Sequence, residues 1–182
     1  FFYANRCIIP YINEGIRMVA EGVEPALIEN AAKLVGMPLG PLQLVDETSI
    51  DLGVKIAKAT KAAMGAAYQD DSVDAVLFPM ADKGRLGRKS NAGFYAYDDK
   101  GQRAGFWDGL EASWPVATDQ PALTGVQHRL LMAQVLEAVR ALEDVWRHGS
   151  DAHASSLAEA LMSAPDAATR LAAAIPHVPV SG

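Results

Sequence analysis

The sequence predicts an all-α fold, because its composition and its hydrophobic periodicity both favour helices. Alanine is the most frequent residue, at 32 of 182 positions, and alanine is the best helix former and is depleted in strands. Between Asn5 and Glu21, apolar residues recur at helical spacing on one face, at Ile8, Ile12, Ile16 and Val19. Half of the residues are hydrophobic and 21% are charged, which is typical of a globular protein with one or two small domains.

Glycine and proline residues divide the first half of the chain into predicted helices. These cover residues 5–21, 25–35, 41–45, 52–68 and 72–82. Pro25 and Pro41 suit the first turn of a helix, and Ser72 is a candidate N-cap. Pro10 lies inside the first pattern and predicts a kink or a first turn there.

The segment after residue 82 is less regular. Residues 84–98 contain three glycines and predict a loop, in which Phe94, Tyr95 and Tyr97 form a short extended segment packed on the helices. Residues 99–125 lack clean periodicity and predict a linker. A helical pattern resumes at Val126, with Leu131 and Val135 on its apolar face.

This last helix repeats the first one. In one ungapped register, 123 residues apart, Arg6 matches Arg129, Glu14 matches Glu137 and Arg17 matches Arg140. The agreement predicts a duplicated helical unit, of which residues 126–182 are a partial and degenerate second copy. The match stops at Val145, and divergence, truncation and a change of reading frame are three explanations of that stop. Residues 154–162 and 167–175 can form further helices.

Composition excludes several classes of protein. No apolar run is long enough for a transmembrane helix, and a net charge of −6 argues against nucleic acid as a partner. The single cysteine rules out an intrachain disulfide and suits a reducing, cytoplasmic location. The four histidines do not form a metal-binding motif, and no G-x-G-x-x-G dinucleotide fingerprint occurs. The chain does not begin with Met, and we interpret it as a fragment of a longer protein.

Few residues stand out as candidates for chemistry. Cys7 lies among isoleucines and predicts a buried structural thiol, and Phe94 and Tyr95 predict packing rather than a ligand platform. The basic residues Lys83, Arg85, Arg88 and Lys89 could meet a phosphorylated ligand, although a solvated loop at a helix C-terminus explains them more simply. Asn5 opens the first helix, and by itself it reads as an N-cap or surface amide.

Three motifs occur in order: FFYANRCIIPYINEGIRMVAEGV, GMPLGPLQLVDETSIDLG and GRLGRKSNAGFYAYD. Together they resemble the C-terminal domain of the 3-hydroxyacyl-CoA dehydrogenases over residues 1–98, and residues 126–144 resemble a weaker second copy. Two such copies are typical of multifunctional beta-oxidation enzymes. The resemblance implies a 6-phosphogluconate-dehydrogenase-C-terminal-like helical bundle at 1–98, a linker at 99–125 and the partial copy at 126–182.

The resemblance also implies a split active site. NAD and a catalytic histidine would belong to a Rossmann domain absent from this chain, so the chain alone is expected to be inactive. Asn5 matches the active-site asparagine of the family's N-R motif and is expected to orient the reacting oxygen or the imidazole. Pro38 and Leu44 match positions associated with the acyl pocket. His128 replaces Asn5 in the second copy, which is therefore expected to be structural.

Our hypothesis from the sequence is the substrate-pocket and dimerisation part of an NAD-dependent 3-hydroxyacyl-CoA dehydrogenase of fatty-acid beta-oxidation. Its expected partners are the acyl-CoA substrate, the enzyme's own Rossmann domain and a second copy in a homo-oligomer, with no nucleic acid. The alternative is a non-catalytic helical dimerisation or interaction module.

Overall fold

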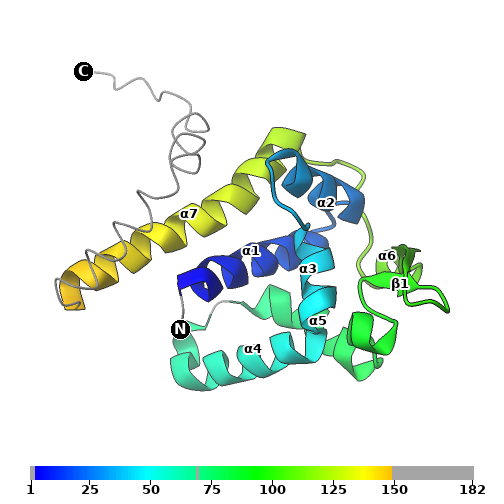
Figure 1. Cartoon of the computed structure of the whole chain (residues 1–182), viewed down its shortest axis with the longest axis horizontal. Helices are drawn as coiled ribbons and strands as arrows, with labels where there is room; N and C mark the ends of the chain where they lie inside the picture. Colours follow the sequence, from blue (N-terminus) through cyan, green and yellow to red (C-terminus); the bar gives the residue numbers. More distant parts are fainter. Residues whose placement is uncertain (1–2, 69, 149–182) are drawn as a thin grey trace. The chain divides into compact units, whose positions relative to one another are not determined.

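The computed structural model describes residues 3–68 and 70–148, and it is mostly helical (Figure 1). Its elements are, in chain order, α1 (Tyr3–Ala20), α2 (Pro25–Leu34), α3 (Pro41–Thr48), α4 (Ile50–Met64), η1 (Gly65–Ala67), α5 (Asp71–Asp82), η2 (Arg88–Ser90), β1 (Tyr95–Tyr97), β2 (Arg103–Phe106), α6 (Gly109–Ser113) and α7 (Leu123–His148). The chain divides into two compact units, and the first unit ends at Leu136.

The core of the first unit forms around α1. This helix packs against α3 and α5, and α4 packs against α5 in turn (Figure 1). Ile16 and Val19 of the predicted apolar stripe are almost fully buried, together with Tyr11 and Met18. Ile8, at the start of the same stripe, remains 38% exposed. The predicted apolar face is therefore confirmed towards the C-terminal end of α1, whereas the N-terminal end of this face is partly exposed to solvent.

The helix boundaries follow the turn residues in most places. α2 and α3 begin at Pro25 and Pro41, as predicted. Pro10 neither starts nor ends α1 but lies inside it. The prediction of Ser72 as an N-cap is wrong, because α5 begins at Asp71 with Asp70 in the cap position.

Glu29 supplies the cap that α3 lacks. The residue before α3 is Gly40, which has no side chain to accept the free N–H groups of the first turn. The buried Glu29 carboxylate of α2 accepts hydrogen bonds from the N–H groups of Leu42 at 2.8 Å and Gln43 at 3.2 Å instead. It also accepts one from the Tyr95 hydroxyl at 2.9 Å. One carboxylate therefore joins α2, α3 and β1.

Asp46, on α3, organises the segment that follows α5. It is 1% exposed, and its carboxylate accepts the N–H groups of Phe94 at 2.9 Å and Tyr95 at 3.0 Å, together with the Tyr97 hydroxyl at 3.1 Å. Burial raises the pKa of Asp46, and the N–H donors of Tyr95 and Phe94 oppose that rise. Phe94 and Tyr95 are buried, which confirms their predicted packing role.

Residues 99–125, predicted as a linker, contain regular structure and belong to the first unit. β2 pairs antiparallel with β1, and the rings of Tyr95 and Phe106 stack with centroids 4.5 Å apart. Leu110 of α6 belongs to the core. Period-two alternation is too short in a strand of four residues to be recognised from the sequence. The division into domains at 98 and 125 stays a prediction.

α7 turns a different face towards the core from the predicted one. Val126 and Leu130 are fully buried, whereas Leu131 and Val135 are only partly buried. The guanidinium of Arg129 binds Glu14 of α1 with Nε and Oε1 2.6 Å apart, and it also binds Glu21. These charge pairs help to set which face of α7 meets α1, and hydrophobic periodicity alone does not contain that information.

Most of the predicted second copy lies outside the described residues, including the helices predicted at 154–162 and 167–175. In the described part of the second unit, Arg140 and Glu137 form an i, i+3 ion pair at 3.7 Å. Arg17 and Glu14 form the same pair in α1. Across residues 3–68 and 70–148, no helix is long and apolar enough to cross a membrane.

Candidate functional site

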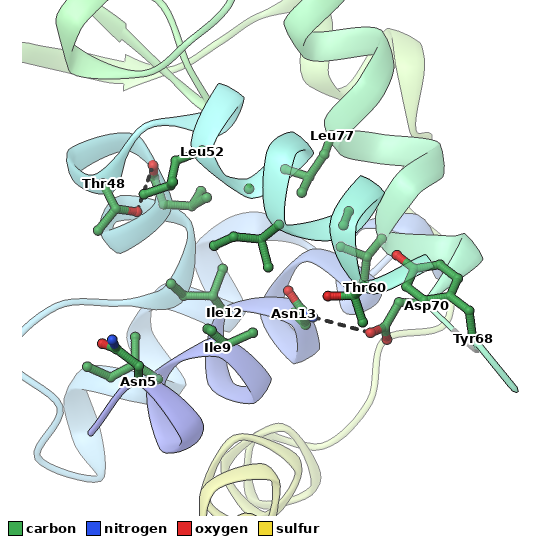
Figure 2. Close-up of a pocket in the computed structure, with 16 residues that line it drawn as sticks. Asn5, Ile9, Ile12, Asn13, Thr48, Leu52, Thr60, Tyr68, Asp70 and Leu77 are labelled. Atoms are coloured by element: carbon green, nitrogen blue, oxygen red, sulfur yellow. Dashed lines mark hydrogen bonds between the residues drawn. The ribbon is translucent and has the colours of Figure 1, made fainter. Parts of the chain in front are cut away.

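A largely apolar pocket of about 270 Å³ opens beside α1 in the first unit (Figure 2). Two helices supply most of its wall, each with one face. From α1 these residues are Asn5, Ile8, Ile9, Ile12 and Asn13; from α4 they are Leu52, Gly53, Ile56, Ala57 and Thr60. The spacings of three, four, seven and eight residues along α1 place its five members on one side of the helix.

Six residues from neighbouring elements complete the pocket. They are Val45, Thr48, Tyr68, Asp70, Val73 and Leu77. In Figure 2, Asn5 and Thr48 lie at one end, and Asn13, Thr60, Tyr68 and Asp70 lie at the other. The pocket therefore has an aliphatic middle and two polar ends.

The end near Asn5 is the more exposed one. Asn5 itself is exposed in the first turn of α1, and Leu52 is 47% exposed. Within the described part of the chain, the Asn5 amide makes no hydrogen bond. It therefore has free donor and acceptor capacity. The first turn of a helix also carries partial positive charge, which stabilises negative charge on a nearby oxygen.

The opposite end is held by a charged network. Asp70 accepts hydrogen bonds from the Arg17 guanidinium at 2.6 Å and from the Asn13 amide nitrogen at 3.4 Å. Arg17 also pairs with Glu14, which binds Arg129 of α7. This chain of ion pairs orients Asp70 and, through it, the Asn13 side chain.

Tyr68 closes the same end from the segment between α4 and α5. Its hydroxyl donates a hydrogen bond to Asp74 at 2.8 Å. Burial, followed by the hydrogen bond to Asp74, raises the pKa of Tyr68 above the ordinary tyrosine value. The phenol is protonated at neutral pH, and it donates its proton in the hydrogen bond to Asp74.

The structure places the three predicted site residues in different surroundings. Asn5 lines the pocket. Pro38 is exposed in the turn before α3, and Leu44 is partly buried on α3 against the core, so neither belongs to the pocket wall. The roles of all three in substrate binding or catalysis stay predictions.

The other candidates have ordinary structural surroundings. Cys7 is partly exposed, not buried as predicted. Arg85 donates to the Gly93 carbonyl, Arg88 pairs with Glu47 and Lys89 pairs with Asp51, so this basic set is engaged within the protein. Among residues 3–68 and 70–148, no cluster of histidine, cysteine or carboxylate side chains could hold a metal ion.

Sequence reasoning missed the polar end of the pocket. Asn13 carries a signal that could have been used, because a polar residue follows Ile9 and Ile12 on the same helix face as Asn5. Thr60 carries the same kind of signal, because it is a polar residue that follows apolar residues on one face of α4. Tyr68 and Asp70 have no local signal, because only tertiary packing brings them to α1.

The first unit is thus a helical domain with a largely apolar pocket between its helices, a common place for a ligand site. Residues 2–97 match the family model for "3-hydroxyacyl-CoA dehydrogenase, C-terminal domain". The chain belongs to this family, and the resemblance seen in the sequence is confirmed.

A solved structure supports the fold. The crystal structure of the dehydrogenase part of multifunctional enzyme 1 from C. elegans matches with a TM-score of 0.60 and 21% sequence identity. The match covers 82% of this chain and 33% of that chain. This chain therefore spans about a third of the length of its structural relative.

Proposed function

We propose that this chain is the substrate-pocket and dimerisation part of an NAD-dependent 3-hydroxyacyl-CoA dehydrogenase of fatty-acid beta-oxidation, from a multifunctional enzyme. The observation that carries this proposal is the position of Asn5. In a member of this family, its amide lies at the exposed end of an apolar pocket on the same helix face as Ile9 and Ile12. An acyl chain in the pocket would place its polar head at this amide.

In this proposal the Asn5 amide donates a hydrogen bond to the C3 oxygen of the substrate. Oxidation of a 3-hydroxyacyl-CoA removes the hydroxyl proton, so negative charge develops on that oxygen. A preorganised donor in the first turn of α1 would stabilise the charge. NAD and the proton-accepting base would belong to a Rossmann domain. The proposal also includes a cytoplasmic location, which the lone cysteine suits.

We keep Pro38 and Leu44 as proposed substrate contacts on the basis of the family resemblance. Because neither lines the pocket, they would meet parts of the substrate outside it, beside the turn that leads into α3. The exposed position of Pro38 is compatible with such a contact.

The test joins this chain to the NAD-binding domain of a 3-hydroxyacyl-CoA dehydrogenase and measures NADH formation from a 3-hydroxyacyl-CoA. Asn5→Ala should lower kcat/KM by about 10²–10³-fold, the effect of losing one transition-state hydrogen-bond donor. Asn30→Ala is the matched control, since Asn30 is exposed on α2 and outside the pocket.

Two results would contradict this assignment. If the Asn5→Ala fusion were as active as the Asn30→Ala control, Asn5 would have no role in the chemistry. Loss of self-association with unchanged kinetics in variants of the helical surface would instead favour a non-catalytic dimerisation module. The chain without the fused domain should also fail to bind NAD in calorimetric titration.

A further inference from the structure

We infer that the pocket selects acyl chains that carry a neutral hydroxyl group at their far end, over chains that end in a methyl group. This inference rests on the proposed function, because it takes the acyl chain as the occupant of the pocket. Its structural basis is the polar end formed by Asn13 and Thr60. A pocket for a plain alkyl chain would have an apolar end. An alkyl ligand removes water from nearby polar groups without replacing their hydrogen bonds, and this loss lowers the affinity for the ligand.

The hydrogen-bonding state of Asn13 defines what this end can bind. Its amide nitrogen faces the Asp70 carboxylate, which can only accept hydrogen bonds. The amide oxygen is thereby left as an acceptor, and Figure 2 shows the side chain beside Asp70, in the part of the pocket away from Asn5. Within the described part of the chain, this oxygen has no donor.

Thr60 offers the complementary group from α4. Its hydroxyl also makes no hydrogen bond with any residue that the structure describes, and it lines the same pocket. A ligand hydroxyl could donate to the Asn13 oxygen and accept from Thr60, which satisfies all three groups.

The charge at this end favours a neutral group. Among the described residues that line the pocket, Asp70 is the only charged one, and no lysine or arginine faces a ligand there. Arg17 already pairs with Asp70. A terminal carboxylate would therefore meet the Asp70 charge without a cation of its own.

Helix geometry sets the length of chain that connects the two ends. Asn5 and Asn13 are eight residues apart on α1, which corresponds to about 12 Å along the helix axis. An extended chain advances roughly 1.2 Å per bond, so about ten bonds span that distance. Ten bonds separate C3 from the terminal oxygen of a 12-hydroxydodecanoyl group.

The test is calorimetric titration of the full 182-residue chain with 12-hydroxydodecanoyl-CoA, dodecanoyl-CoA and dodecanedioyl-CoA, which ends in a carboxylate. The hydroxylated thioester should bind about tenfold more tightly than the alkyl one, as expected for one or two net hydrogen bonds. The carboxylated thioester should bind most weakly.

Variants assign the preference to the polar end. Thr60→Val, which keeps the shape of the side chain, should reduce the preference for the hydroxyl to about threefold or less. Asn13→Leu should abolish it, with circular dichroism to verify folding. Thr118→Val is the control, because Thr118 is exposed and outside the pocket.

The outcomes separate this inference from the proposed function. Equal binding of the hydroxylated and alkyl thioesters would overturn the inference alone. A preference for the hydroxyl in a chain whose fusion enzyme is inactive would support the polar end and contradict the dehydrogenase role. Absence of binding by all three thioesters would overturn the pocket as an acyl site, and the inference with it.

Discussion

Replacing Glu29 by alanine should be among the most damaging single changes in the first unit. The carboxylate is 3% exposed and accepts three hydrogen bonds, from the backbone N–H groups of Leu42 and Gln43 and from the Tyr95 hydroxyl. Glu29→Ala leaves three buried donors without an acceptor. At about 1–3 kcal/mol for each buried unsatisfied donor, and with less than full additivity among neighbours, we expect a loss of about 3–5 kcal/mol.

The matched variant is Glu29→Gln, which keeps one oxygen for the two N–H groups. Its amide nitrogen would face the Tyr95 hydroxyl, which can rotate to accept. We expect a loss of only about 1 kcal/mol. Urea unfolding, monitored by near-ultraviolet circular dichroism, measures the stability of both variants. With an m-value of about 2 kcal/mol/M, the unfolding midpoint of the alanine variant should fall by roughly 2 M urea.

Asn30→Ala, an exposed neighbour on α2, controls for the change in helix sequence and should stay within about 0.5 kcal/mol of the parent. If Glu29→Ala unfolded at the same urea concentration as Asn30→Ala, Glu29 would not be the cap of α3. If the alanine and glutamine variants were equally unstable, loss of the negative charge, which both variants share, would explain the effect better than loss of hydrogen bonds.

Two further predictions concern the hairpin region and the surface. Gly93→Ala should lower the free energy of unfolding in urea by about 1–3 kcal/mol, because a Cβ there would overlap the Asp46 carboxylate. Gly125→Ala should raise it by about 0.5–1 kcal/mol, because Gly125 lies in α7 with open space around it. Hydrogen bonds from Lys89 and Ser49 lower the pKa of Asp51 to about 2, so this pair stabilises the fold above about pH 4 and loses its effect as the pH falls towards 2. In an NMR titration, Lys89→Met should move that pKa towards the ordinary value of 3.8, and an unchanged pKa would contradict the pairing.

The elements that the sequence predicted correctly are those with local signals. Pro25 and Pro41 start helices because their fixed φ suits a first turn and their missing N–H is not needed there. The burial of Ile16 and Val19 follows from the period of the α1 stripe. Such signals act within a few residues, so they do not depend on the rest of the fold.

The elements that the sequence predicted poorly depend on partners far along the chain. The buried face of α7 is set partly by Arg129 reaching Glu14, 115 residues away. The hairpin depends on Asp46, which lies 48 residues before Phe94. The polar end of the pocket needs Asp70 beside Asn13. Periodicity cannot show these pairings, because each couples residues on separate elements.

These long-range contacts also explain how α3 serves as a pocket wall. Consecutive residues of a helix point about 100° apart, so Val45 faces the pocket while Asp46 faces the hairpin. Glu29 fixes the start of α3 and Asp46 fixes its middle, and both carboxylates meet at Tyr95. The hairpin and the pocket therefore contact different faces of the same short helix.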